Sequence, residues 1–202
     1  KEPIKLYNYY LFIGLLVWNF FSLSLTKATP SIMFERALIK KSAFPRMVIP
    51  LSIILSNAFH LLVDMLLYAV PLSVIGVLSI SKLPALLLGV LLLLSFTIGL
   101  SLLTTALNVR YRDVNFMVQA ALIIWFYGTP IVYSLSMVPG RYQWLWHINP
   151  LTSVTQLLQH VFVNSPPPTI VMLQSNTTII VIICILGILL FEKESKNFDD
   201  WV

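Results

Sequence analysis

The sequence predicts an all-α protein that crosses a membrane several times, and three observations support this fold class. Of its 202 residues, 58% are hydrophobic and only 10% are charged, whereas soluble domains carry about 25% charged residues. The mean hydropathy is +0.87. Several apolar runs approach the roughly 20 residues that a helix needs to cross a bilayer. No change in composition marks a linker, so we expect one domain over residues 1–202.

Five membrane spans can be assigned to apolar segments, approximately at residues 7–25, 47–80, 83–107, 114–138 and 169–191. As a single helix, the second segment would be about 51 Å long, compared with a hydrocarbon core of about 30 Å. We therefore expect it to tilt, to leave the membrane, or to break near Pro50 or Pro71. The fifth segment begins with polar residues, so its buried part should start near Ile179.

Basic residues are unevenly distributed between the two sides of these spans. One side carries nine of them: Lys27, Arg36, Lys40, Lys41, Arg46, Arg110, Arg112, Lys193 and Lys196. The other side carries Lys1, Lys5, Lys82 and Arg141. Because basic loops stay in the cytoplasm, this bias predicts a cytoplasmic carboxyl terminus and an external start of the sequence. An odd number of spans that starts outside fits a protein with one more span upstream.

The first cytoplasmic loop predicts a short helix over about residues 30–41. Thr29 is suited to cap this helix, and Pro30 is suited to its first position. The helix would present apolar residues on one side and charged residues on the other: Met33, Phe34, Ala37 and Leu38 opposite Glu35, Arg36 and Lys40. It could therefore be a membrane-surface helix anchored by basic residues, or a docking helix for a cytoplasmic partner.

The outer segment, about residues 139–165, predicts short helices between the fourth and fifth spans. Asn149 can cap a helix that starts at Pro150 and stops at Asn164. Its apolar residues recur at helical spacing and its other face is polar but almost uncharged, which suits a lid at the outer interface. Trp144 and Trp146 fit an aromatic belt at that interface, or rings that stack on sugars.

His60 and Asp64 are the polar residues of the second span that stand out. They are four positions apart and share one helix face. A mid-bilayer aspartate costs about 2.5–3.5 kcal/mol, so the pair should face protein or water. It could bond to a neighbouring helix or belong to an intramembrane enzyme.

Known catalytic and binding motifs are missing from the sequence. There is no phosphate-binding loop, zinc-protease motif or nucleophile elbow, and the histidines do not converge on a metal site. We expect neither a catalytic residue nor a metal ion. The net charge of +5 is spread over the loops, which gives no nucleic-acid surface. The single cysteine, Cys184, excludes an intramolecular disulfide.

Five motifs, in this order and spacing, resemble the permease subunit of type-2 ABC exporters of the polysaccharide-export branch. They are Gly14–Phe21, Leu38–Arg46 followed by Pro50, Asn108–Val114, Pro130–Tyr133 and Asn149–Thr152. In that family six spans follow an amphipathic entry helix, and the entry helix and first span have no counterpart here. Members of this branch export O-antigen, teichoic acid or capsule-like glycans.

The resemblance implies a transport subunit of the inner membrane rather than an enzyme. Two copies would form a channel, and each would bind a separate ABC ATPase that holds the ATP and magnesium, so no cofactor is expected in this chain. The contact would involve Phe34, Glu35, Arg36, Leu38, Lys40 and Lys41. A lipid-linked glycan would enter from the cytoplasmic leaflet of the surrounding lipid membrane.

Specific residues of the path can be suggested from their chemistry. Arg36, Lys40, Arg110 and Arg112 would attract a pyrophosphate-bearing lipid. Alternatively, Arg110, Arg112 and Asp113 form a membrane anchor with an internal ion pair.

Aromatic residues are the candidates for the sugar path and its gate. Trp125, Tyr127 and Tyr133 could line the path, with Trp144 and Trp146 at its outer end, or they could pack against lipid and core. The remaining alternatives are an exporter of a drug or small lipid, and a membrane anchor without a path.

Overall fold

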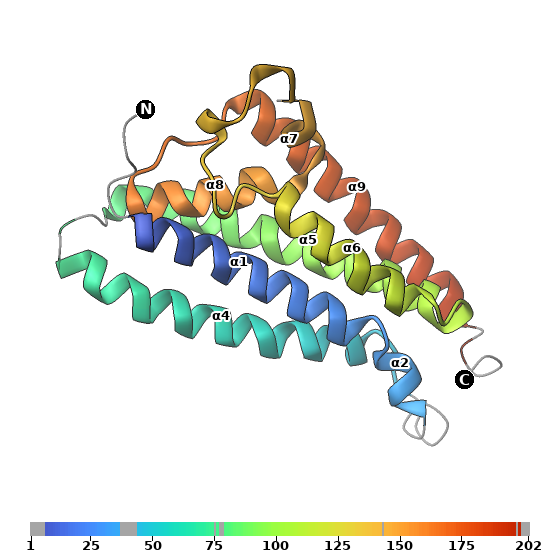
Figure 1. The fold of residues 1–202 in the computed structure, drawn as a ribbon. Coiled ribbons are helices and arrows are strands. Elements are labelled where there is room, and N and C mark those ends of the chain that lie inside the picture. Colours follow the sequence, from blue (N-terminus) through green and yellow to red (C-terminus); the bar gives the residue numbers. More distant parts are fainter. Residues whose placement is uncertain are drawn as a thin grey trace.

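The computed structural model describes residues 7–36, 44–74, 76, 79–142, 144–196 and 198, and these form a helical bundle (Figure 1). No strand occurs in these ranges. The α-helices are α1 (Tyr7–Ala28), α2 (Ser31–Phe34), α4 (Val48–Val74), α5 (Leu83–Arg110), α6 (Val114–Gly128), α7 (Trp144–Ile148), α8 (Pro150–Val163) and α9 (Ile170–Ser195). Three short 3-10 helices are η1 (Ile80–Lys82), η2 (Leu135–Met137) and η3 (Gly140–Tyr142).

Four helices in the described part of the chain are long and apolar enough to cross a membrane. They are α1, α4, α5 together with η1, and α9. The predicted class, an all-α polytopic membrane protein, is therefore confirmed.

Helix α4 is shorter than the predicted second span of residues 47–80, because it ends at Val74. Neither proline breaks it. Pro50 lies in the first turn, where the backbone N–H has no helical partner. Pro71 lies within the last turn. The 27 residues still make a helix of about 40 Å, which must tilt in the bilayer or extend from it.

Helix α6 ends at Gly128, so the prediction of one continuous span over residues 114–138 is wrong. Pro130 disfavours helical geometry at the residue before it, and Thr129 is extended, with φ −106° and ψ 136°. The 15 residues of α6 rise only about 22 Å, less than a hydrocarbon core. The non-helical residues Thr129 and Ile131 are nevertheless buried, at 1% exposure each.

Helix α5 is the centre of the bundle and packs against α9, α8 and α1. Its contact with α9 is made by glycines. A Cβ atom added at Gly187 of α9 would overlap the carbonyl oxygen of Gly99 in α5, so the two backbones touch. Close approach of this kind is how small residues join helices in membranes. The α5–α9 pair is therefore a tight unit.

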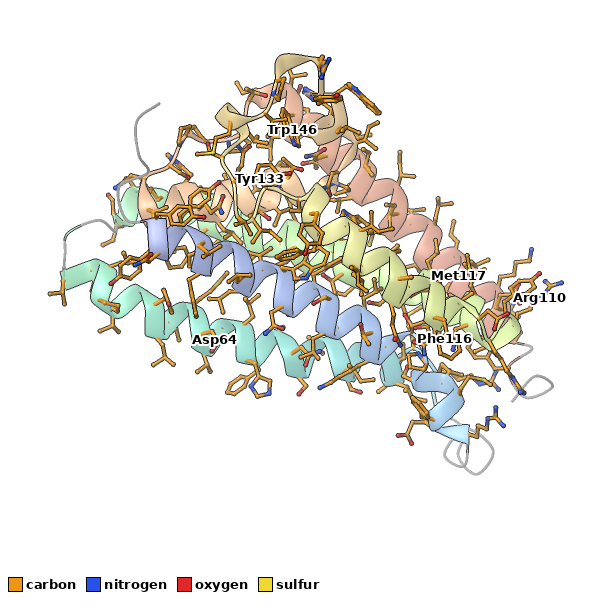
Figure 2. All side chains as sticks on the ribbon, in the orientation of Figure 1. Asp64, Arg110, Phe116, Met117, Tyr133 and Trp146 are labelled. Carbon is orange, nitrogen blue, oxygen red and sulfur yellow. The ribbon has the colours of Figure 1, made fainter. Side chains whose placement is uncertain are left out.

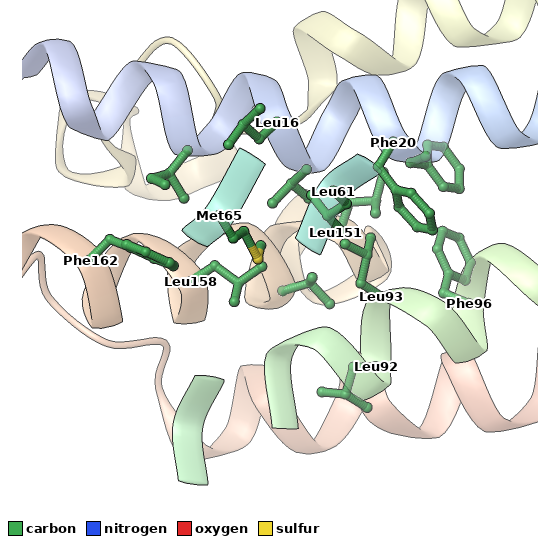
Figure 3. Close-up of a cluster of buried hydrophobic side chains, with 14 of the residues drawn as sticks. Leu16, Phe20, Leu61, Met65, Leu92, Leu93, Phe96, Leu151, Leu158 and Phe162 are labelled. Atoms are coloured by element: carbon green, nitrogen blue, oxygen red, sulfur yellow. The ribbon is translucent and has the colours of Figure 1, made fainter. Parts of the chain in front are cut away.

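The main apolar core lies between α1, α4, α5 and α8 (Figure 3). Phe21 of α1 stacks on Phe96 of α5 with ring centroids 5.3 Å apart. Leu61 and Met65 of α4 belong to the same core. Between membrane-spanning helices, such side chains contribute through van der Waals packing rather than through removal from water.

Helix α8 begins after Asn149 and ends at Asn164 as predicted, but it is not a lid with an exposed polar face. Thr152, Ser153 and Gln159 are fully buried. Two polar groups of this face have partners on neighbouring helices: Gln159 Nε2 donates to the Tyr10 carbonyl at 3.2 Å, and Asn176 Nδ2 donates to Ser153 Oγ at 3.1 Å. The buried hydroxyls of Thr152 and Thr155 bond to no described residue. Helix α8 is therefore an interior element, packed against α5, α1 and α9.

Candidate functional site

The two ends of the bundle carry different residues. Arg110, α2 and the carboxyl end of α9 share one end, while Tyr133 and Trp146 lie towards the other (Figures 1 and 2). We call the first end the basic end. The residues predicted to be cytoplasmic are thus together in space where they are described.

The predicted coupling helix is described only in its first part, as α2. Phe34 is 79% exposed at the tip, and Glu35 is exposed beside it. Arg36 is half-buried, and its Nη2 lies 3.8 Å from the sulfur of Met33. Leu38, Lys40 and Lys41 lie outside the described residues. An exposed phenylalanine flanked by charges is a suitable contact for another protein.

The prediction that Thr29 caps this helix is wrong, because Pro30 occupies the cap position and no side-chain cap bond forms. The Thr29 hydroxyl instead donates to the Leu25 carbonyl at 2.7 Å and shares a 2.9 Å bond with Thr104 of α5. Thr105 Oγ1 donates to the Ala28 carbonyl at 2.8 Å. These bonds tie the root of the coupling region to α5.

The turn between α5 and α6 carries the predicted rim residues. Arg110, Arg112 and Asp113 are all exposed. The guanidinium of Arg110 lies 5.4 Å from the centre of the Tyr111 ring. The Asn108 side-chain oxygen accepts from the backbone N–H of Asn115 at 3.1 Å, which fixes the turn. Cationic groups are thus presented at the basic end.

The aromatic path candidates do not share one surface. Trp125 packs in the core, with its ring 5.5 Å from that of Phe21, and Trp146 is 6% exposed. Tyr127 and Trp144 are 74% and 58% exposed. Trp125 thus packs in the core, which is the alternative to a position in the sugar path. Tyr127 keeps an outward position on α6.

Tyr133 belongs to a loop that is fastened to two helices. Its hydroxyl donates to the Tyr127 carbonyl at 3.1 Å, and its own carbonyl accepts from Tyr10 Oη at 3.3 Å. Burial raises the pKa of the Tyr133 hydroxyl, an effect partly offset by a hydrogen bond with Trp146. The side chain therefore stays neutral, and its hydrogen bond holds the loop against α6.

On α4, His60 is exposed, and Asp64, labelled in Figure 2, is half-buried. Neither bonds to a described residue; His60 only meets the Phe59 ring edge-on at 6.3 Å. Bonding to a neighbouring helix is therefore not observed within the described ranges. Nor do any three His, Cys, Asp or Glu residues of these ranges come together as metal ligands.

Asn149 has a role that its sequence context does not reveal. Besides capping α8 through Leu151, its oxygen accepts from Trp125 Nε1 at 2.9 Å. Its amide donates to the Gly128 carbonyl at 3.1 Å and to Thr129 Oγ1 at 3.0 Å. One side chain thus fixes the end of α6, the break after it and the start of α8. Only the cap could be predicted, because the other partners depend on tertiary structure.

A groove between α1 and α4 at the basic end was also not predicted. It consists of two adjoining cavities of about 360 and 320 Å³ that share Lys27, Ser52 and Ile53. The first extends to α2, and the second extends along α4 to Asn57. Its charged residues, Lys27 and Glu35, come from the end of α1 and the segment after α2, and its other wall comes from α4.

Comparison with known proteins identifies the family. Residues 3–163 match the family described as ABC-2 type transporter. An O-antigen export system permease protein RfbA of Klebsiella pneumoniae is 32% identical over 169 residues, which cover 82% of this chain and 64% of that protein. A second K. pneumoniae protein of this name is 31% identical over 202 residues, covering 98% and 76%.

A third protein of this name, from Myxococcus xanthus, is 29% identical over 164 residues, covering 80% of this chain and 63% of that protein. In two of these three comparisons, the aligned chain spans less than two thirds of the relative. The family match extends over most of the sequence, so the chain belongs to the ABC-2 type transporter family of membrane domains.

Proposed function

We propose that this chain is the channel-forming subunit of an ATP-driven exporter of lipid-linked polysaccharide. The observation that carries the proposal is the similarity, along most of the chain, to three permeases named for O-antigen export. The glycan would be O-antigen, teichoic acid or a capsule-like polymer. The basic end would face the cytoplasm, as the distribution of lysine and arginine predicts.

The proposal is tested by deleting the gene and labelling glycan on the cell surface. Loss of surface glycan, restored by the wild-type gene, is the expected result. Unchanged surface glycan together with altered sensitivity to small toxic compounds would contradict it and favour the alternative of a drug or small-lipid exporter.

In this proposal a separate ABC ATPase binds at the exposed tip of the coupling region. Phe34 would enter a pocket of the ATPase, with Glu35 and Arg36 at its rim. The 79% exposure of Phe34 supports this role, because a large ring is otherwise costly to leave in water. Movements of the ATPase would reach the bundle through the bonds of Thr29 and Thr105 with α5 and α1.

Replacement of Phe34 tests the coupling contact. Phe34→Ala should lower glycan-dependent ATP turnover about tenfold or more, since an aromatic anchor contributes about 2 kcal/mol or more. The protein level in the membrane should change little, because the ring has few intramolecular contacts. Phe59→Ala, which removes a 65% exposed ring from α4, is the matched control. Equal loss of turnover and protein level in Phe34→Ala would indicate misfolding instead.

A second copy would complete the channel next to α6. This helix is too short to span a bilayer alone, and within the described residues its main helix contacts are with α1 and α5. Apart from Gln119, its outward side chains are mainly apolar or aromatic. They include Phe116, Met117 and Tyr127, exposed by 69%, 68% and 74%. Such a face suits contact with protein as well as lipid.

Cysteine crosslinking in membranes tests this arrangement. In a Cys184→Ser background, Met117→Cys should give a disulfide-linked dimer on oxidation. Ile185→Cys on α9, which replaces a 52% exposed side chain, should not. Crosslinking at position 185 with none at 117 would place the second copy elsewhere.

A further inference from the structure

The groove between α1 and α4 contains two opposite charges that do not pair. Lys27, in the last turn of α1, and Glu35, after α2, both line the larger cavity. They form no ion pair with one another, and no other described residue pairs with either. Opposite charges held apart in one cavity fit a ligand that carries both a negative and a positive group.

The same cavity contains a buried hydroxyl without a partner. Ser31 is 3% exposed, lines the cavity, and its Oγ makes no hydrogen bond to a described residue. Leaving a buried hydroxyl without a hydrogen bond is unfavourable. A ligand oxygen beside Lys27 would accept a bond from it. This observation is independent of the two charges.

The larger cavity also has apolar walls, which lie next to a lipid-exposed helix. Phe44, Val48 and Ile53 contribute to the larger cavity, and Ile53 continues into the smaller one. Only 22% of the apolar window of α4 is buried. The apolar side chains of the larger cavity adjoin this lipid-facing surface, and the smaller cavity adds the polar residues Ser56 and Asn57 further along α4.

We propose that this groove binds the headgroup of a zwitterionic phospholipid with a primary ammonium, drawn from the leaflet at the basic end. The phosphate accepts from Lys27 Nζ and Ser31 Oγ, and the ammonium donates to the Glu35 carboxylate. A quaternary ammonium has no N–H to donate, and an anionic headgroup without an amine leaves Glu35 unpaired. The lipid would bridge α1, α2 and α4 at the root of the proposed coupling region.

Photolabelling in nanodiscs tests the site with the full-length protein. The probe is a phosphatidylethanolamine with a photoreactive group near the headgroup, and mass spectrometry locates the label. We expect it on residues 48–57. Unlabelled phosphatidylethanolamine should compete about tenfold better than phosphatidylcholine or phosphatidylglycerol, the difference that one charge-assisted hydrogen bond provides. Equal competition by all three lipids, or equal labelling of α9, would overturn the proposal.

Variants separate the two charges. Lys27→Gln should weaken labelling about tenfold, and Ser31→Ala by less. Glu35→Gln should remove the preference for the primary amine over phosphatidylcholine. Lys193→Gln is the control, because Lys193 also lies in the last turn of a spanning helix but lines neither cavity of the groove. Labelling that persists at wild-type strength in folded Lys27→Gln protein would exclude the site.

Soluble glycerophosphoethanolamine distinguishes a lipid from a free metabolite. It should compete poorly, because it lacks the acyl chains that the apolar walls would hold. Competition as strong as that of the whole lipid would overturn the membrane source. These measurements need neither ATP nor glycan. The lipid proposal can therefore fail while the transport proposal holds, and the transport proposal can fail while the lipid proposal holds.

Discussion

Two outer helices, α9 and α4, are attached to the bundle in different ways. Each exposes most of its apolar surface, with 17% and 22% of its apolar window buried. Helix α9 touches α5 at the backbone, through Gly187 and Gly99. Helix α4 is joined to α1 by side chains: the rings of Tyr68 and Phe12 stack at 3.8 Å, and Asn57 Nδ2 donates to Ser24 Oγ at 3.1 Å.

The difference affects what each contact can accommodate. A backbone contact through glycines leaves no room for a ligand and tolerates no added atom. A contact through long side chains leaves space where those side chains end, and the groove beside Lys27 lies at such a place. We therefore expect α5 and α9 to move as one unit, while the contact between α1 and α4 can adjust.

The largest effect is expected at the glycine contact. Gly187→Ala adds a methyl group where the Gly99 carbonyl lies, so α5 and α9 must separate along their length. Overpacking of this kind costs about 1–3 kcal/mol or more, and here the obstacle is backbone that cannot rotate away. The protein should lose most of its monodisperse peak in detergent size-exclusion chromatography and melt at a much lower temperature.

Gly128→Ala is the matched control for this substitution. No atom lies within 4 Å of a Cβ added at Gly128, and its φ is not positive. The variant should behave like the wild type. If both alanine variants melt alike, the backbone contact does not govern stability.

An intermediate effect is expected where rings join α4 to α1. Tyr68→Ala removes the stack on Phe12 and an edge contact with Tyr9 at 5.9 Å. The free energy of unfolding should fall by about 1–2 kcal/mol from the lost ring contacts, because aromatic pairs contribute about 0.5–1.5 kcal/mol each. Tyr68→Phe keeps both ring contacts and should melt within error of the wild type, which a thermal shift measurement can show.

A smaller effect is expected from the buried bond between Asn57 and Ser24. Hydrogen bonds between membrane helices average about 0.6 kcal/mol in double-mutant cycles. Asn57→Ala, Ser24→Ala and the double variant should therefore show a coupling energy of about that size in denaturant titrations. A coupling near zero would mean that the α1–α4 contact depends on its rings and apolar side chains alone.

Local signals predicted part of this structure correctly. The start of α8 at Asn149–Pro150 is set by a side chain and a ring within two residues, so it is readable from sequence. The end of α6 carried a signal too, in Thr129–Pro130, but the apolar residues that follow suggested a longer span. Hydrophobicity alone does not distinguish a membrane helix from a buried non-helical segment.

Features that depend on distant partners could not be predicted. Gly99 and Gly187 lie on two different helices, and the sequence around either residue does not predict their contact. The burial of the polar face of α8 is aided by the Tyr10 carbonyl and by Asn176, which bond to Gln159 and Ser153 from other helices. The groove likewise depends on the tertiary fold, because Lys27 and Glu35 line it together with residues of α4.

The smallest effect on stability is expected at His60 and Asp64, whose role the sequence left open. Neither bonds to a described residue, so His60→Asn with Asp64→Leu breaks no observed contact. Asp64 is half-buried within a span, and removing its carboxylate removes a cost of about 2.5–3.5 kcal/mol on insertion scales. We therefore expect an unchanged or higher melting temperature, since surface substitutions away from special contacts usually change stability by less than about 0.5 kcal/mol. We also expect surface glycan within about twofold of the wild type.

The reverse substitution sharpens this last prediction. Leu62→Asp adds a carboxylate to the same helix at a side chain that is 54% exposed, and it should lower the amount of protein in the membrane. Loss of glycan export by the double variant at a normal protein level would instead assign His60 and Asp64 a functional role. That role could be in an intramembrane enzyme or in a contact with another subunit. Retained export would mean that transport does not depend on these two side chains.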